Sequence, residues 1–199
     1  ICVALDLGGG FLKVLVTGGA GFIGSHLCQR LSSMGHTVVA VDNLSTGVIS
    51  NLADLEETSS FSFVQGSILD SELLRKLISA SEYVFHLAAA VGVFNIVNKP
   101  LESLVTNIRG TENVLASSQE FGVPVFLSSS SEVYGKNISD SLSESDDRVL
   151  GSPVTLRWSY SEAKAIDESL AFAYYTEKQL ETRIVRIFNT YGPRMRLND

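Results

Sequence analysis

A glycine cluster near the start of the chain constrains the fold more than any other feature. The run KVLVT, residues 13–17, is typical of a buried strand, and residues 22–34 have the apolar spacing of a helix. Between them lies GGAGFIG, a G-x-x-G-x-x-G pattern in which Gly18 permits a tight turn and Gly21 permits close approach of a pyrophosphate. Gly24 lets the helix pack on the strand, and the helix N-terminus favours an anion. The unit therefore predicts a dinucleotide site.

A second glycine cluster, LDLGGG, ends at Gly10, just before this unit. The stretch DLGGGFLK resembles the first phosphate loop of actin-like sugar kinases, where an Asp and glycines form a β-hairpin. That interpretation needs FLKVLV as the returning strand, together with further phosphate and adenosine motifs that the sequence does not show. We therefore expect residues 18–24 to bind phosphate and residues 1–11 to form an N-terminal lead-in, either loose or an extra edge strand.

The rest of the chain alternates strand and helix patterns. Strands are expected at residues 37–42, 61–65, 83–87, 125–128 and 182–188, and helices at residues 71–78, 101–121 and 159–177. Continuous apolar strands separated by helices indicate a parallel sheet with both faces covered. The predicted fold class is therefore α/β, a doubly wound parallel sheet of the Rossmann type.

Asp42 is the last residue of the predicted strand that follows the glycine unit. A carboxylate there accepts hydrogen bonds from the adenosine ribose and repels a 2′-phosphate, so it favours NAD over NADP. We expect residues 12–199 to form an NAD-binding domain.

Composition excludes several kinds of partner. The net charge is −7 and no basic run occurs, so a nucleic-acid partner is not expected. No apolar run is long enough to span a membrane. The two cysteines form no disulfide framework, the three histidines show no metal-ligand spacing, and we expect a reducing, cytoplasmic location and no metal.

Two groups four residues apart suggest acid–base chemistry. Tyr160 and Lys164 begin a predicted helix and share one face, so the ammonium is expected to lower the phenol pKa beside a cationic nicotinamide. Ser130 lies in a serine run at the end of a predicted strand, where side chains face the ligand crevice.

Seven motifs occur in an order that resembles extended short-chain dehydrogenase/reductases acting on nucleotide sugars: TGGAGFIGSHL, VDNLSTG, HLAA, NIRGT, SSSSEVYG, YSEAK and RIFNTYGPRM. The resemblance runs from Lys13 to Asn198. It implies that Ser130 assists Tyr160, that Glu132 acts at the sugar, and that Asn189 contacts the substrate diphosphate. It also implies a nucleotide-sugar substrate, namely a UDP-sugar, and a homodimer built on the helix that carries Tyr160.

Within the family, the ending RIFNTYGPRM and the motif SSEVYG are most similar to UDP-glucuronate decarboxylases, which oxidise C4, lose CO₂ and form UDP-xylose. The stretch RWSYSEAK departs from that pattern, so UDP-glucose 4-epimerase and NDP-sugar 4,6-dehydratase stay open. A non-catalytic NAD-binding module is the alternative from another class. It is favoured because family members continue well beyond this sequence, so that most of the C-terminal substrate lobe is expected to be missing.

One further departure concerns the cofactor site. Ser67 stands where the family carries an aspartate for the adenine amino group, which should weaken NAD binding by about 1–2 kcal/mol. The resemblance places Asn107 near the nicotinamide. The full set of expected cofactor-binding residues is Gly18, Gly21, Phe22, Ile23, Gly24, Asp42, Asn43, Ser67, Ile68, Leu87, Ala88, Ala89, Asn107, Tyr160 and Lys164, and the catalytic set is Ser130, Glu132, Tyr160 and Lys164.

Overall fold

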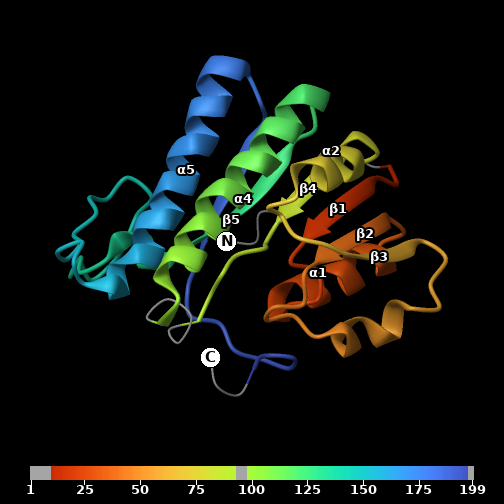
Figure 1. Ribbon diagram of the computed structural model, residues 1–199, viewed down its shortest axis with the longest axis horizontal. Helices are drawn as coiled ribbons and strands as arrows, with labels where there is room; N and C mark the ends of the chain where they lie inside the picture. Colours follow the sequence, from red (N-terminus) through yellow and green to blue (C-terminus); the bar gives the residue numbers. More distant parts are fainter. Residues whose placement is uncertain (1–9, 93–97, 197–199) are drawn as a thin grey trace.

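The computed structural model describes residues 10–92 and 98–196 and contains a six-stranded parallel sheet (Figure 1). The strand order is β3-β2-β1-β4-β5-β6, which confirms the predicted doubly wound fold. The bounds differ from the predicted ones by two residues at most. The strands are β1 (Lys13–Thr17), β2 (Thr37–Asp42), β3 (Phe61–Gln65), β4 (Tyr83–His86), β5 (Val125–Ser130) and β6 (Thr182–Ile187).

The predicted helices are all present, and α4 and α5 lie side by side (Figure 1). Their bounds are α1 (Phe22–Ser33), α2 (Ser71–Ser79), α4 (Pro100–Phe121) and α5 (Ser159–Lys178). Three short 3₁₀ segments had no sequence prediction, because they lack the apolar period of a longer helix. They are η1 (Ile49–Leu55), η2 (Ser131–Tyr134) and η3 (Leu156–Trp158).

Successive side chains of a strand point to opposite faces of the sheet, so the core has two layers. Leu15 on β1 faces a cluster that includes residues of α2, α4 and α5, whereas Val14 and Val16 face a cluster with α1 and η1. All three β1 side chains are completely buried. A strand with apolar residues on both faces belongs in the middle of a parallel sheet, and β1 lies there.

The position of β1 settles the choice between the two glycine clusters. β1 pairs in parallel with β2 on one side and with β4 on the other. Both of its edges are therefore occupied, and it cannot be the returning strand of a kinase-type hairpin. Residues 1–9 of the expected lead-in lie outside the described residues.

The strand order reverses between β1 and β4, and the carboxyl ends of these strands open the crevice where doubly wound folds bind ligands. None of the helices in the described ranges is long and apolar enough to cross a membrane. The same ranges hold no cluster of three or more His, Cys, Asp or Glu suited to a metal ion.

Candidate functional site

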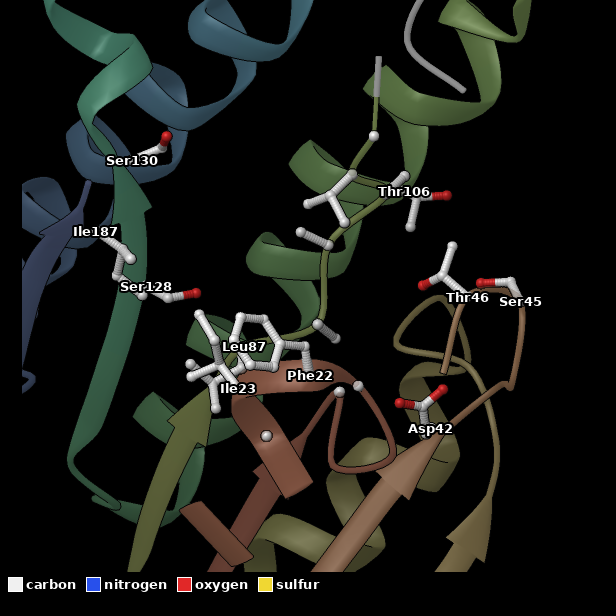
Figure 2. A pocket seen from close by; sticks show the side chains of 18 of the residues that line it. Phe22, Ile23, Asp42, Ser45, Thr46, Leu87, Thr106, Ser128, Ser130 and Ile187 are labelled. Atoms are coloured by element: carbon white, nitrogen blue, oxygen red, sulfur yellow. The ribbon is translucent and has the colours of Figure 1, made fainter. Parts of the chain in front are cut away.

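A cavity of about 500 Å³ lies at the carboxyl ends of the strands, with Asp42 on one side and Ser130 on the other (Figure 2). This volume is typical of a small-molecule site. All but two of the residues singled out from the sequence line it. Those lining it are Gly18, Gly21, Phe22, Ile23, Gly24, Asp42, Asn43, Ile68, Leu87, Ala88, Ala89, Ser130, Glu132, Tyr160, Lys164 and Asn189.

The glycine loop brings backbone, rather than side chains, to the cavity. Gly18 has a φ of +71°, and a Cβ there would lie 2.8 Å from the backbone nitrogen of Ala88. A Cβ on Gly24 would collide with the carbonyl oxygen of Gly18. Gly21 is the N-cap of α1 and makes no side-chain cap hydrogen bond. The first-turn N–H groups of α1 are therefore available to an anion.

Asp42 extends from the end of β2 toward the cavity (Figure 2). Its Oδ2 accepts a hydrogen bond from the Ala20 backbone N–H at 3.1 Å, and its Oδ1 accepts one from Leu44 at 2.8 Å. Each carboxylate oxygen can accept a further hydrogen bond. Asp42 is thus oriented by the glycine loop while retaining the capacity to bind a ribose.

Several lining residues were missed by the sequence analysis. Ser45 and Thr46 follow β2, Ser128 lies on β5 and Ile187 ends β6 (Figure 2). Their position near the carboxyl ends of strands was a signal that could have found them. Thr106 lies on α4 and carried no such signal.

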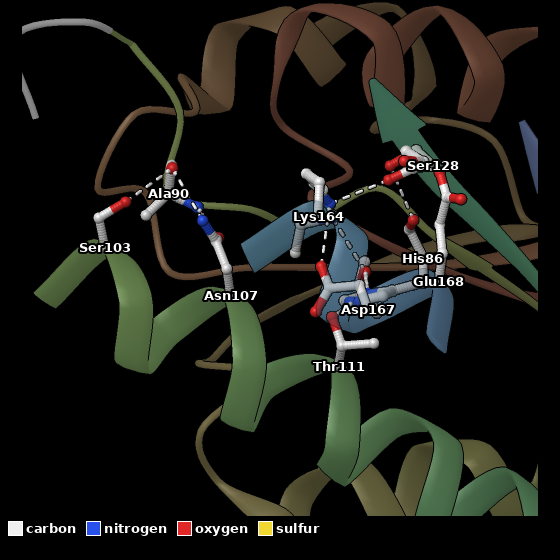
Figure 3. Close-up of polar contacts among 12 residues, drawn as sticks. His86, Ala90, Ser103, Asn107, Thr111, Ser128, Lys164, Asp167 and Glu168 are labelled. Carbon is white, nitrogen blue, oxygen red and sulfur yellow. Dashed lines mark hydrogen bonds and ion pairs between the residues drawn. The ribbon is translucent and has the colours of Figure 1, made fainter. Parts of the chain in front are cut away.

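Ser67 and Asn107 do not line the cavity. The Ser67 hydroxyl accepts a hydrogen bond from the Leu69 N–H at 3.2 Å, which stabilises its own turn. Asn107 is almost fully buried and binds both backbone groups of Ala90, at 2.6 and 3.3 Å (Figure 3). Asn107 therefore shapes the loop after β4, and any effect on a ligand passes through that loop.

Tyr160 does not have the lowered pKa that its spacing from Lys164 suggested. Burial raises the phenol pKa, the negative charges of Asp167 and Glu132 raise it further, and a hydrogen bond with Ser130 opposes them. The chain's own residues therefore favour the protonated phenol.

Lys164 is directed into the protein interior and is 2% exposed. Its ammonium donates to the Ser128 carbonyl oxygen at 2.9 Å and lies 3.4 Å from an oxygen of Asp167 (Figure 3). Burial lowers its pKa, and the charge of Asp167 opposes that effect. The Lys164 charge is therefore shared between its contact with Asp167 and its effect on Tyr160.

Glu132 carries a partner that the sequence did not reveal. Both of its oxygens accept hydrogen bonds from Arg157 on η3, at 2.8 and 2.9 Å. Arg157 in turn lies over the Trp158 ring, 5.5 Å from its centroid. The RWSYSEAK stretch thus supplies a cation directly to the expected sugar-side glutamate.

Comparison with known proteins places this site in a family. The model of the NAD dependent epimerase/dehydratase family matches residues 14–199. The chain is 41% identical over 182 residues to a UDP-N-acetyl-alpha-D-glucosaminuronate decarboxylase of Bacillus cytotoxicus, covering 92% of this chain and 56% of that protein. It is 36% identical over 197 residues to UDP-glucuronic acid decarboxylase 1 of Arabidopsis thaliana, covering 99% and 44%. The chain spans about half the length of the curated relatives it matches.

Solved structures agree with this relationship. A UDP-N-acetylglucosamine 4-epimerase from Methanobrevibacter ruminantium, in complex with UDP-N-acetylmuramic acid, superposes with a TM-score of 0.86 and 32% identity, covering 95% of this chain and 58% of that one. A dTDP-glucose 4,6-dehydratase from Streptomyces venezuelae with NAD bound gives a TM-score of 0.84 and 32% identity, covering 92% and 57%.

The residues present fit the cofactor of these proteins. The glycine loop leaves its backbone open to a pyrophosphate, and Asp42 has free acceptor capacity for a ribose at the end of β2. The chain belongs to the NAD dependent epimerase/dehydratase family, whose cofactor is NAD.

Proposed function

We propose that this chain carries the cofactor-binding and acid–base half of a UDP-hexuronate decarboxylase that converts UDP-glucuronate to UDP-xylose. One observation carries the proposal: Ser130, Glu132, Tyr160 and Lys164 line the same cavity as the glycine loop. The decarboxylase names of several relatives support the choice of reaction.

The proposed roles follow from the positions of the side chains. Tyr160 takes the proton of the sugar C4 hydroxyl as the phenolate, a form that the chain alone disfavours and that the positive charge of a bound nicotinamide would favour. Ser130 stabilises this phenolate by donating a hydrogen bond. Lys164 supplies positive charge on the buried side of the pocket. Asn189 binds the substrate diphosphate, and Glu132, held by Arg157, faces the sugar carbons that react.

Decarboxylation follows from the oxidation state of the sugar. NAD, when bound, accepts the hydride of C4 and later returns it. With C4 as a ketone, the uronate is a β-keto acid, so the bond from C5 to the carboxylate breaks, CO₂ leaves and the electron pair moves onto the C4 oxygen as an enolate. A proton from water then adds to C5 and restores the C4 ketone before the hydride returns. Tyr160 gives its proton back to that oxygen when the ketone is reduced.

The same cavity could serve 4-epimerisation or 4,6-dehydration, since relatives with those names share the fold. A binding module without turnover is the second candidate, because the chain spans about half of its relatives. We also propose a homodimer through α5, on which Phe172 is 57% exposed. Leu170 and Tyr174 of that helix instead pack against the core.

Calorimetry tests the proposal directly. NAD⁺ is titrated into the chain first, followed by UDP-glucuronate or its N-acetylglucosaminuronate counterpart, and CO₂ release is measured in parallel. Binding of both ligands with CO₂ release, lost in Tyr160→Phe, is the expected result. NAD⁺ binding without sugar binding would instead establish the non-catalytic module, and release of a 4-epimer or a 6-deoxy product would identify an alternative reaction.

A further inference from the structure

Asp167 is a fully buried carboxylate that none of the proposed roles uses. It lies on α5, one turn after Lys164, and points into the interior between α5 and α4 (Figure 3). Its Oδ2 lies 3.4 Å from the Lys164 ammonium, and Thr111 of α4 faces it. The carboxylate thus lies under the side chain that borders the cavity.

This carboxylate is poorly satisfied by the groups around it. Neither oxygen has a hydrogen-bond partner of ordinary geometry among the described residues. Burial raises the pKa of Asp167, and the Lys164 charge and the nearby Thr111 hydroxyl oppose that effect. A buried carboxylate without hydrogen bonds is strongly unfavourable unless a charge of opposite sign compensates it. The ammonium of Lys164 provides that charge. It has the same requirement, because within the described part of the chain the Ser128 carbonyl oxygen is its one other hydrogen-bond partner.

The other charged groups near Lys164 are engaged elsewhere. Glu168 of α5 forms a two-pronged ion pair with Arg186 of β6, at 2.9 and 2.8 Å. Glu132 of η2 is held by Arg157 in the same way. Each of these carboxylates is therefore paired with an arginine. The charge of Glu168 still raises the pKa of Lys164, but less than that of Asp167 does, and the charge of Glu132 still raises the pKa of Tyr160.

His86 of β4 does not compensate Lys164 either. Its two ring nitrogens lie 2.7 Å from the Thr17 hydroxyl and 3.1 Å from the Thr111 hydroxyl. Burial lowers the pKa of His86 to about 3, and the positive charge of Lys164 adds to that effect. The ring is therefore neutral at physiological pH, and Asp167 is the main counter-charge for Lys164 among the described groups.

We propose that Asp167 is a positioning residue that anchors the Lys164 ammonium and keeps it charged, one helical turn from Tyr160. The proposal rests on the role assigned above to Lys164. The negative charge of Asp167 attracts the ammonium and repels a phenolate, so it raises the proton affinity of both groups. Asp167 therefore favours the state in which Lys164 is an ammonium and Tyr160 is a neutral phenol. Without the charge of Asp167, these two groups together should lose their first proton at lower pH.

Tyrosinate absorbance measures this effect without turnover. Subtracting the tyrosinate absorbance of Tyr160→Phe from that of the wild type gives the titration of Tyr160 alone. The same subtraction between Asp167→Asn and the double variant Asp167→Asn/Tyr160→Phe gives the titration of Tyr160 without the Asp167 charge. We expect the apparent pKa of Tyr160 to change by about one unit or more in Asp167→Asn. It falls if Lys164 stays charged, because the phenolate is no longer repelled, and it rises if Lys164 loses its proton first. Glu162→Gln is the matched control, because Glu162 lies on the same helix but is exposed and pairs with Arg148. It should leave the Tyr160 titration unchanged.

A structural role alone would give a different result. Asp167→Asn would then lower the melting temperature while Tyr160 titrated as in wild type, and that outcome overturns the proposal. If the amide variant does not fold, Asp167→Ala removes the charge without leaving a polar atom buried. The wild-type chain gives an independent test, since Tyr160 ionising at or below the ordinary value of about 10 would also overturn the proposal. Failure of the proposed function would appear separately, as absence of CO₂ release by the wild type.

Discussion

Gly24 and Gly122 differ in what surrounds them, and this difference predicts two distinct effects of an added methyl group. A Cβ on Gly24 would collide with the Gly18 carbonyl oxygen inside the phosphate loop, whereas no described residue lies within 4 Å of a Cβ on Gly122. Gly24→Ala should destabilise the fold by about 1–3 kcal/mol through overpacking and weaken NAD⁺ binding at least about tenfold. Calorimetry and chemical unfolding measure the two effects.

Gly122→Ala is the control for that prediction. Gly122 ends α4 with a φ of +66°, so alanine costs about 1 kcal/mol of backbone strain there. Its NAD⁺ affinity should equal that of the wild type. Equal NAD⁺ affinity in the two alanine variants would show that the loop around Gly24 does not bind the cofactor.

His86 predicts how folding stability depends on pH. Its folded pKa of about 3 lies below the ordinary value of 6.5 because burial disfavours the charged ring. Below pH 6.5 the unfolded chain therefore binds a proton that the folded chain does not. Stability from this residue is complete above that pH and falls as the pH drops toward 3, by about 2 kcal/mol between pH 7 and pH 5.

Urea unfolding at pH 7 and at pH 5 measures the dependence. His86→Gln lowers stability at both values because it loses contacts with Thr17 and Thr111. The quantity to compare is the difference between the two pH values within each protein, which should shrink by about 2 kcal/mol in the variant. An unchanged difference would mean that His86 titrates normally in the folded state.

At the scale of elements, α5 is joined to β6 by an ion pair that is largely buried. Glu168 and Arg186 have side chains 8% and 16% exposed, and the Ser129 hydroxyl of β5 also donates to Glu168. Glu168→Gln leaves Arg186 poorly compensated and should cost about 3 kcal/mol. Glu181→Gln breaks a second pair with an arginine of β6, Arg183, but that pair is exposed and should cost less than about 1 kcal/mol.

Thermal unfolding of the two variants decides this point. Similar losses for Glu168→Gln and Glu181→Gln would show that burial does not strengthen the α5–β6 connection. A larger loss for Glu168→Gln, restored in part when Arg186 is also replaced by Met, would assign the cost to the unpaired arginine.

The elements also show which features the sequence could predict. Apolar period and strand-end position were enough for the strands, the helices, the glycine loop and Asp42, because these patterns are local. The pairing of Glu132 with Arg157 could not be predicted from such patterns, because the two residues are 25 positions apart and Arg157 lies in a 3₁₀ segment without periodicity. Asp167 was missed for a different reason. A charged residue on a helix is normally assigned to the solvent face, and its burial follows from packing against α4.

At the scale of the whole molecule, the two faces of the sheet are covered unequally. Helices α2, α4 and α5 pack on one face, and α1 with η1 on the other. Over β6, the second face is open among the described residues: Val185 is 42% exposed, and Phe188 just beyond the strand is 53% exposed. Since β6 is also an edge strand of the described sheet, this surface favours association with other chains.

The two exposed apolar surfaces predict different kinds of association. The α5 surface around Phe172 should form a closed dimer, whereas the β6 surface around Val185 should add an indefinite, concentration-dependent association. Sedimentation velocity should therefore show dimers and larger species for the wild type. Val185→Lys should leave dimers, because a lysine on an edge strand opposes pairing. Adding Phe172→Lys should then give monomers. If Val185→Lys leaves the larger species unchanged while Phe172→Lys removes them, α5 mediates all of the association and the open face of β6 contributes none.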